Sequence, residues 1–439
     1  MRCRRSANSP RTRPESLTPY GRTVSDPLHV VISGAGIGGL TAALSLARDG
    51  ARVTLLERAP VFEEVGAGLQ LSPNATNILQ DLGVLDRLRP WSLAPEALRI
   101  RRARDGDDLV RMPLGPLADA RWGAPHLVAH RADLQRILVE ACAARPLITV
   151  RTDAEVLGFA SVTEGERSSV QVGLLDSGKH ARVDGDVLIA ADGLRSALRE
   201  RLGLGLSDTP IYSGRTAWRA LVPAAKAPAY ALRMETNLWL GARAHLVHYP
   251  LRAGDLVNLV AIIEDPWRGE DSTDIWRDPK DADPKYLKRS FGGWAKEARD
   301  LLDAAPQWRR WPLFERRFAP RWSLDNVVMM GDAAHPILPF LAQGAGLAIE
   351  DAEAIGRAFK THGRNVAAAI RMFENERIPR ASDIALASRR QAAIYHMSGP
   401  MALARDAFMR RVTGDGMHRR VDWIYGYRKG AGARRRILP

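Results

Sequence analysis

Gly34-Ala35-Gly36-Ile37-Gly38-Gly39 is the stretch of sequence that decides the fold. An apolar run at 29–33 precedes it and predicts a buried strand, and a segment with helical apolar spacing, 40–49, follows it. Glycines at these positions permit a tight turn, the close approach of a pyrophosphate and close packing of helix on strand. The N-terminus of the helix stabilises the phosphate charge. The stretch therefore predicts the opening βαβ unit of a dinucleotide-binding domain.

Glu57 ends a second apolar run, 51–57, at the place where such a unit contacts its nucleotide. The carboxylate can accept hydrogen bonds from an adenosine ribose, and its charge would repel a 2′-phosphate. A glycine-rich turn without a ligand is the alternative interpretation. The motif alone does not distinguish NAD from FAD.

Two later segments each contain an apolar strand that ends in glycine and aspartate. Residues 186–196 contain Asp192-Gly193, and residues 327–336 contain Gly331-Asp332. A glycine-rich start of a helix, Ala342-Gln343-Gly344-Ala345-Gly346, follows the second segment. A plain NAD dehydrogenase would explain neither aspartate.

The remaining pattern predicts how this domain is completed. Short runs broken by proline and glycine over 211–264 predict a mostly antiparallel sheet inserted into the α/β framework. Helical patterns occupy 343–359 and 366–395. The predicted fold class is therefore α/β: a Rossmann-like domain with an inserted, mostly antiparallel substrate-binding sheet and C-terminal helices.

The three segments, in this order and spacing, resemble the single-component FAD-dependent aromatic hydroxylases, the group A flavoprotein monooxygenases, and in particular their salicylate hydroxylase-like branch. The resemblance extends from about Val30 to Tyr427. Further matches to that branch are 66–74 (GAGLQLSPN), 130–134 (HRADL), 217–219 (AWR), 248–251 (HYPL), 349–352 (IEDA) and 423–427 (WIYGY).

This resemblance implies a reaction and a set of cofactor contacts. Such enzymes reduce FAD with NADH or NADPH, form a flavin C4a-hydroperoxide with O₂, and hydroxylate a small aromatic, here expected to be a hydroxylated aromatic acid. NADH is the expected donor. The family implies that Asp332 holds the ribityl chain or phosphates and that Asp192 supports the pyrophosphate region. The full set of expected cofactor contacts is Gly34, Gly36, Gly38, Gly39, Glu57, Arg58, Gly68, Arg131, Asp192, Asp332, Gly344 and Ala345.

Candidate catalytic residues lie on a predicted strand in the inserted sheet. Strand alternation places His245, Val247 and Tyr249 on one face and Leu246 and His248 on the other. A histidine of ordinary pKa can accept a phenol proton near neutrality. The resemblance implies the same two positions, because family members that act on hydroxylated benzoates and hydroxynicotinate place His and Tyr at this four-residue spacing. We therefore expect His245 and Tyr249 to be catalytic and His248 to be structural.

Other positions depart from the family pattern or suggest no chemistry. Gln70 stands where hydroxynicotinate enzymes have a histidine, and Pro339, followed by Phe340, stands where some hydroxybenzoate hydroxylases have glutamine. His335 has no partner at metal-ligand spacing, so we expect a loop role and no metal. Trp218 is the tryptophan expected to face a pocket.

Charge and composition bound the remaining possibilities. The net charge is +14, but most of it lies at the two ends of the chain, so a basic nucleic-acid-binding face is not expected. Only two cysteines, Cys3 and Cys142, are present, which fits a reducing, cytoplasmic setting. We expect a monomer or homodimer without an integral membrane span. The expected division of the chain is 1–27, a disordered basic extension; 28–208, the first part of the FAD-binding domain; 209–322, a β-rich substrate domain; 323–397, the second part of the FAD-binding domain with a long helix; and 398–439, a C-terminal segment with a basic tail.

Two functional alternatives stay open at this point. One is a flavin-dependent epoxidase or hydroxylase for a larger substrate without a phenol. The other is a membrane- or protein-docked flavoprotein whose basic ends carry the function.

Overall fold

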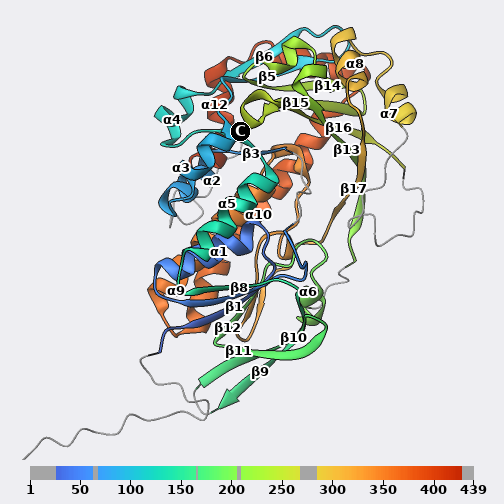
Figure 1. The fold of residues 1–439 in the computed structure, drawn as a ribbon. Coiled ribbons are helices and arrows are strands. Elements are labelled where there is room, and N and C mark those ends of the chain that lie inside the picture. Colours follow the sequence, from blue (N-terminus) through green and yellow to red (C-terminus); the bar gives the residue numbers. More distant parts are fainter. Residues whose placement is uncertain (1–25, 63–67, 165–166, 205–208, 267–283, 428–439) are drawn as a thin grey trace, which may run out of the picture.

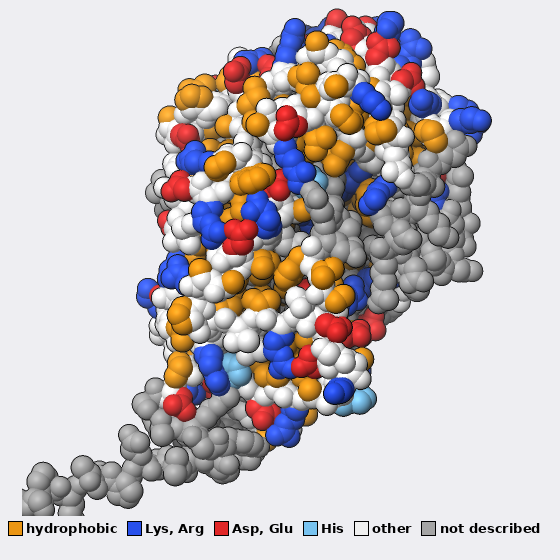
Figure 2. Space-filling view, in the orientation of Figure 1, with side chains coloured by type: hydrophobic (Ala, Val, Ile, Leu, Met, Phe, Trp, Pro, Cys, Tyr) orange, Lys and Arg blue, Asp and Glu red, His pale blue; other side chains and the backbone are white. Residues whose placement is uncertain are grey.

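The computed structural model describes residues 26–62, 68–164, 167–204, 209–266 and 284–427. The expected basic tail after 427 and all but two residues of the expected extension 1–27 lie outside this part of the chain. Within it, none of the helices is both long enough and apolar enough to cross a membrane. Basic and acidic side chains are interspersed on the face shown in Figure 2.

A six-stranded sheet carries the glycine-rich turn. Its strands pair in parallel except for β18 with β19. In spatial order the strands are β18 (Ser323–Leu324), β19 (Val327–Met329), β12 (Val187–Ala190), β1 (His29–Ser33), β2 (Arg52–Leu56) and β8 (Ile148–Arg151). Helices α1 (Ile37–Arg48), α5 (Arg131–Ala143) and α9 (Gly344–His362) pack together beside this sheet (Figure 1). The continuous apolar strands at its centre are buried, as expected for a parallel sheet covered by helices.

A seven-stranded sheet forms the opposite end of the molecule (Figure 1). All its pairings are antiparallel except that of β14 with β5. In spatial order the strands are β17 (Arg309–Glu315), β13 (Ile211–Pro223), β16 (Leu256–Glu264), β15 (Ala244–Leu251), β14 (Glu235–Gly241), β5 (Ala97–Arg102) and β6 (Asp108–Pro113). The sheet is therefore not built from the inserted region alone, because two strands come from within 28–208. Strands so far apart in the sequence leave no local pattern that predicts their pairing.

Smaller sheets and the remaining helices surround these two. The small sheets have the orders β11-β10-β9 and β3-β7-β4, with β3 (Gly68–Leu71), β4 (Ser92–Leu93), β7 (Leu127–His130), β9 (Ala154–Glu164), β10 (Arg167–Asp176) and β11 (Lys179–Gly185). The helices are α2 (Pro73–Asp81), α3 (Leu85–Leu88), α4 (Pro116–Trp122), α6 (Ala197–Arg201), α7 (Pro284–Ser290), α8 (Lys296–Asp303), α10 (Val366–Tyr395), α11 (Gly399–Met409) and α12 (Gly414–Tyr425). The long helix α10 extends between the two ends of the molecule (Figure 1).

The seven-stranded sheet has two distinct faces. We call the face with His245, Val247 and Tyr249 the inner face and the face with Leu246 and His248 the outer face. On the outer face, Leu246 and other apolar residues pack against α7 and α8. On the inner face, residues of β13 and β16 pack against α10 and the short helix η7 (Pro339–Leu341). The alternation expected from sequence is thus present.

Trp218 departs from expectation. It is 2% exposed and lies in the outer-face core, stacked on Tyr286 at 6.2 Å between ring centroids. Its neighbour Ala217 faces inward instead. The period of two along β13 decides this placement, and the indole fills the space beneath α7.

Candidate active site

The glycine-rich turn lies at the carboxyl end of β1, tightly packed against the adjacent strand. Gly34 has a φ of +103°, and a Cβ on it would lie 2.5 Å from the Ala191 carbonyl oxygen. A Cβ on Gly39 would lie 2.0 Å from the Gly34 carbonyl oxygen. By contrast, a Cβ on Gly36 would meet nothing within 4 Å. Gly36 is the N-cap residue of α1, and no side chain there hydrogen bonds to the first amides of the helix. The first amides of α1 are thus left open to an anion.

Glu57 lies directly beside this turn. Its carboxylate accepts hydrogen bonds from the Ala35 N–H at 2.9 Å and the Ala59 N–H at 3.0 Å. Gln135, from α5, donates to the Ala35 carbonyl at 3.0 Å, so the turn is held from two sides. Arg58, the next residue, is exposed and makes no hydrogen bond or ion pair within the described residues.

Asp192 follows β12 and faces the same edge of the sheet. Its Oδ2 accepts the Leu198 N–H at 3.4 Å, whereas Oδ1 is buried and has no partner in the described part of the chain. Burial raises the pKa of this carboxyl above its usual value, although hydrogen bonds from Ser196 and nearby amides oppose the rise. A buried carboxylate oxygen without a partner is suited to accept a hydrogen bond from a bound cofactor.

Asp332 and Arg131 approach one another from different segments. Both side chains are exposed in the structure, and each lies close enough to act on the other electrostatically. The protein packed around Asp332 raises the pKa of its carboxyl, while the charges of His335 and Arg131 oppose that rise. The Asp332 carboxyl therefore lies at the surface, at a place where much protein surrounds it. Gly331, at a φ of +58°, makes the turn that presents Asp332 there.

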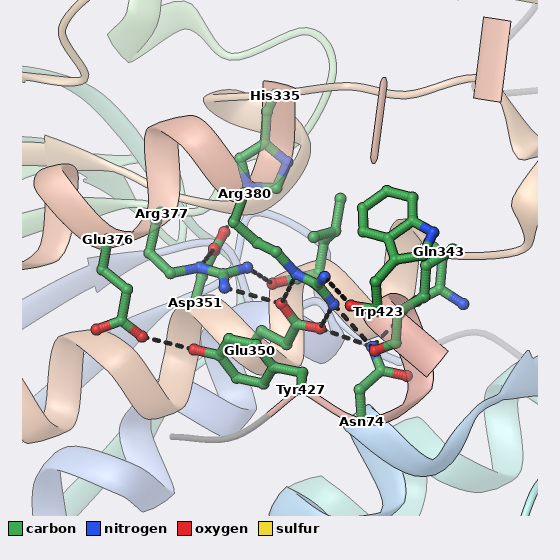
Figure 3. Close-up of polar contacts among 12 residues, drawn as sticks. Asn74, His335, Gln343, Glu350, Asp351, Glu376, Arg377, Arg380, Trp423 and Tyr427 are labelled. Atoms are coloured by element: carbon green, nitrogen blue, oxygen red, sulfur yellow. Dashed lines mark hydrogen bonds and ion pairs between the residues drawn. The ribbon is translucent and has the colours of Figure 1, made fainter. Parts of the chain in front are cut away.

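A buried ionic network, shown in Figure 3, holds this turn and the start of α9. Asp351 accepts the Gly331 N–H at 2.8 Å, lies 2.5 Å from His335 Nε2, and accepts Arg377 Nε at 2.7 Å. Glu350 accepts from Arg377 at 2.8 Å and from Arg380 at 2.8 Å. We call Glu350, Asp351, Arg377 and Arg380 the paired network. It fixes the position of Gly331-Asp332 without facing the site itself.

The same network reaches the N-terminus of α9. Asn74, on α2, donates to Glu350 Oε1 at 2.7 Å and to Gln343 Oε1 at 3.0 Å. Gln343 is the N-cap of α9 and its side chain is occupied by these neighbours, so it does not cap the helix. A Cβ on Gly344 would meet nothing within 4 Å. Gly344 and Ala345 therefore begin a helix whose partial positive charge faces open space.

His245, on β15, lies deep on the inner face. It is 2% exposed, with ring centroids 5.4 Å from Phe340 and 5.3 Å from Tyr395. Its Nδ1 lies 2.9 Å from Nε2 of His396, the C-cap of α10. Burial, with His396 and Arg215 adding to its effect, moves the pKa of His245 well below 6.5. The expectation of an ordinary histidine pKa is therefore wrong, and His245 is a neutral imidazole at pH 7.

Tyr249 lies on the same face, one row of side chains beyond Val247. A Cβ on Gly68 would lie 2.7 Å from its ring and 2.8 Å from its hydroxyl, so the tyrosine packs directly on β3. Gly68 also donates its N–H to Asn258 Oδ1 at 2.8 Å, which fixes this contact. Burial raises the pKa of Tyr249, with the charge of Arg219 opposing the rise. Gly68, expected to contact the cofactor, thus also shapes the space around Tyr249.

Arg219 is a site residue for which sequence analysis assigned no role. It lies on the inner face two residues from Ala217, half-buried, with its guanidinium 5.5 Å from the centre of the Trp311 ring. Its Nε is buried and has no hydrogen-bond partner, and no carboxylate pairs with it among residues the structure describes. Burial lowers the pKa of the Arg219 guanidinium. The charge of Arg131 lowers this pKa further, whereas Tyr249 opposes the decrease. Its sequence signal was the Ala217-Trp218-Arg219 match.

In the portion of the chain that is described, no three His, Cys, Asp or Glu side chains group to hold a metal ion. His335 is engaged by Asp351, as described above.

Comparison with known proteins identifies the family. Residues 27–388 match the FAD binding domain family. The 3-hydroxybenzoate 6-hydroxylase of Klebsiella oxytoca is 33% identical, over 92% of this chain and 97% of that enzyme. The 3-amino-4-hydroxybenzoate 2-monooxygenase of Streptomyces platensis is 34% identical, over 91% and 96%. Klebsiella pneumoniae HpxO, solved with FAD and uric acid, matches with a TM-score of 0.75 and 27% identity, over 89% of this chain and 94% of that one. The chain therefore belongs to the FAD-dependent aromatic hydroxylases, the group A flavoprotein monooxygenases, and FAD is its cofactor.

Proposed function

We propose that the protein hydroxylates a small aromatic acid that carries a phenol, using FAD, O₂ and NADH or NADPH. NADH is the proposed donor, and the proposed state is a cytoplasmic monomer or homodimer. Support for the substrate class comes from relatives named for hydroxybenzoates and from the polar groups of the inner face.

Arg219 carries this proposal. A half-buried guanidinium without a counter-ion is unfavourable, because the charge loses hydration and gains no partner. The cost is offset when a ligand brings a carboxylate, which a guanidinium binds with two parallel hydrogen bonds. Arg219 lies on the same face as His245 and Tyr249. A carboxylate bound there would hold an aromatic ring against the groups that act on its phenol.

The residues around the glycine turn fit FAD. The open amides of α1 would bind its pyrophosphate, Glu57 its adenosine ribose, and the unpartnered oxygen of Asp192 a hydroxyl or amide nearby. Asp332 and Arg131 would hold the ribityl and phosphate groups. When bound, FAD supplies the reduction of O₂ and the transfer of one oxygen atom to the substrate. The start of α9, at Gly344 and Ala345, would stabilise negative charge on the flavin ring.

His245 would accept the phenol proton. A neutral imidazole can act as a base, and hydroxylation needs the phenolate because its ring is the better nucleophile. His245 and Tyr249 are four residues apart, so their Cα atoms are separated by about 13 Å along the strand. That span suits one group at each end of an aromatic acid, with Tyr249 orienting the substrate. Apolar neighbours such as Phe340 and Val247 exclude water from the site.

The test is hydroxylation by the FAD-loaded enzyme across a panel of hydroxybenzoates and matched phenols without a carboxylate. We expect NAD(P)H oxidation coupled to a hydroxylated product only with the acids. His245→Ala should lower the hydroxylation rate by about 10²–10⁴-fold and leave FAD content unchanged. Activity should partly return at high pH, where the free phenol ionises unaided.

His248→Ala is the matched control, because His248 lies on the same strand but on the outer face. It should affect stability and leave hydroxylation near the wild-type rate. Equal losses in the two variants, or a fully FAD-loaded enzyme that hydroxylates no phenolic acid, would contradict the proposal.

A further inference from the structure

A chain of three side chains leads from the inner face to the surface. His245 Nδ1 lies 2.9 Å from His396 Nε2, and His396 Nδ1 lies 3.4 Å from Glu264 Oε1. The histidines are 2% and 5% exposed, whereas the Glu264 side chain is 37% exposed. The three residues belong to β15, the end of α10 and the end of β16. Their order in space is therefore buried base, buried imidazole, solvent-exposed carboxylate.

No hydrogen bond within the described residues explains why His396 Nδ1 is buried. That nitrogen is buried and makes no aligned hydrogen bond in the described chain, and Glu264 is the acceptor it approaches. A buried polar nitrogen without a partner calls for an explanation. The His396 backbone is held separately, since its carbonyl accepts the Arg243 N–H at 3.2 Å.

The charges around the three side chains favour passage of a proton over its retention. Arg215, on β13, lies 3.7 Å from Glu264, and Arg243 lies 3.8 Å from it. Arg405, on α11, binds the carbonyls of Ile394 and Tyr395 near His396. Burial and the charges of Arg215 and Arg405 lower the pKa of His396 to about 3. Both imidazoles are therefore neutral at rest, each with a single ring N–H, and Glu264 offers the nearest negative charge.

We propose that His245, His396 and Glu264 form a proton path that carries the substrate's phenolic proton to solvent. The inference rests on the proposed function, since it assumes that a phenol binds at His245. His396 and Glu264 do not touch the substrate, so they are positioning residues that act through His245.

Each transfer in the path is balanced. The phenol gives its proton to Nε2 of His245 as the proton on Nδ1 passes to Nε2 of His396. The proton on Nδ1 of His396 passes to Glu264, which releases it to water. One proton leaves the substrate, one reaches solvent, and both imidazoles remain neutral. A proton returning along the path restores both tautomers after the ring is hydroxylated.

The test follows phenol ionisation directly. Oxidised, FAD-loaded enzyme is mixed with 3-hydroxybenzoate in the absence of NAD(P)H, and phenolate absorbance is recorded in a stopped-flow instrument from pH 6 to 9. His396→Gln keeps a side chain that can hydrogen bond to His245 but cannot pass on a proton. We expect ionisation to slow by about 10-fold or more, with FAD content, melting temperature and substrate Kd near the wild-type values.

Glu264→Gln removes the exposed end of the path and carries the test even if His396→Gln folds poorly. We expect a smaller slowing, about 3- to 10-fold, and a changed pH profile in which added buffer base restores the rate. Glu315→Gln is the matched control, because Glu315 is a partly exposed carboxylate on β17 that pairs with Arg389 at 2.8 Å. It should ionise substrate at the wild-type rate.

The outcomes separate the two proposals. Wild-type ionisation rates in both His396→Gln and Glu264→Gln, alongside a slow His245→Ala, would overturn the path and leave the proposed function intact. If the wild-type enzyme neither ionises nor hydroxylates 3-hydroxybenzoate or any other phenolic acid of the panel, the proposed function itself fails, and the path fails with it.

Discussion

Two buried polar regions of this molecule differ in how completely their charges are paired. In the paired network, Asp351 and Glu350 face Arg377 and Arg380, and every one of these groups has partners at 2.5–3.1 Å. On the inner face of the seven-stranded sheet, Arg219 has no counter-ion in the described chain. One region is complete without a ligand and the other is not.

The difference separates groups that build the site from groups that use it. A satisfied network holds its members in one arrangement, and it positions Gly331-Asp332 and the start of α9. An unsatisfied group is retained at a cost in stability, which a bound ligand offsets. Substitutions in the two regions should therefore change stability in opposite directions.

The largest effect is expected from Asp351→Asn. The amide leaves Arg377 with less negative charge in a place where its guanidinium is fully buried. Breaking one side of such a pair costs about 3–5 kcal/mol in the free energy of unfolding, measured by urea denaturation. Glu140→Gln, which weakens exposed pairs with Arg87 and Arg136, is the control and should cost about 1 kcal/mol or less. Equal costs in both variants would remove the distinction between the paired network and surface pairs.

Arg219→Met should act in the opposite direction on stability. Removing a charge without a counter-ion should leave the free energy of unfolding unchanged or raise it by about 1 kcal/mol. Binding of a hydroxybenzoate should weaken by about 10- to 100-fold, the worth of a charge-assisted hydrogen bond. A matched phenol without a carboxylate should bind equally to both proteins, as measured by flavin absorbance changes. A destabilised variant with unchanged acid binding would show that Arg219 is structural.

The smallest effect concerns His248, which tests whether a buried group without partners always marks a site. Neither ring nitrogen of His248 has a hydrogen-bond partner in the described chain, yet it lies on the outer face against Trp239. Burial, with Arg101 adding to it, lowers its pKa to about 3. The unfolded chain therefore takes up a proton below about pH 6.5 that the folded protein does not accept until near pH 3, so stability falls as the pH falls through this range.

His248→Phe should remove that contribution. Between pH 7.5 and 5.5 the wild type should lose about 1.4 kcal/mol more of its unfolding free energy than the variant does. Urea denaturation at the two pH values measures the difference, and hydroxylation should be unaffected. An identical pH dependence in the two proteins would mean that the pKa of His248 is not lowered inside the fold.

Much of the nucleotide-binding half was predictable because its signals are local. The strand, turn and helix around the glycines, the helix over 366–395 and the alternation along β15 all follow from short-range patterns. The fold class, the family and the FAD cofactor are confirmed by the family match. The roles of the individual site residues stay predictions.

What the sequence did not show depends on contacts between distant segments. The pairing of β5 with β14 joins residues far apart in the chain, and His396 reaches His245 only because α10 ends beside the sheet. The pKa of His245 depends on this burial, so its sequence neighbours could not reveal it. Arg219 belongs to a segment that matches the family, so the sequence pointed to it. That it has no counter-ion among the described residues depends on its contacts with distant segments.

The order of strands in the six-stranded sheet has a consequence for the making of the protein. One neighbour of β12 is β1, which is translated first, but the other is β19, which is translated only after all seven strands of the seven-stranded sheet. At about 5–20 residues per second, the ribosome leaves the edge of β12 without its partner for on the order of ten seconds. An unpaired apolar strand edge is a template for wrong association. During the interval between these two strands the nascent chain therefore exposes an apolar strand edge, and the interval ends only when Val327–Met329 leaves the ribosome.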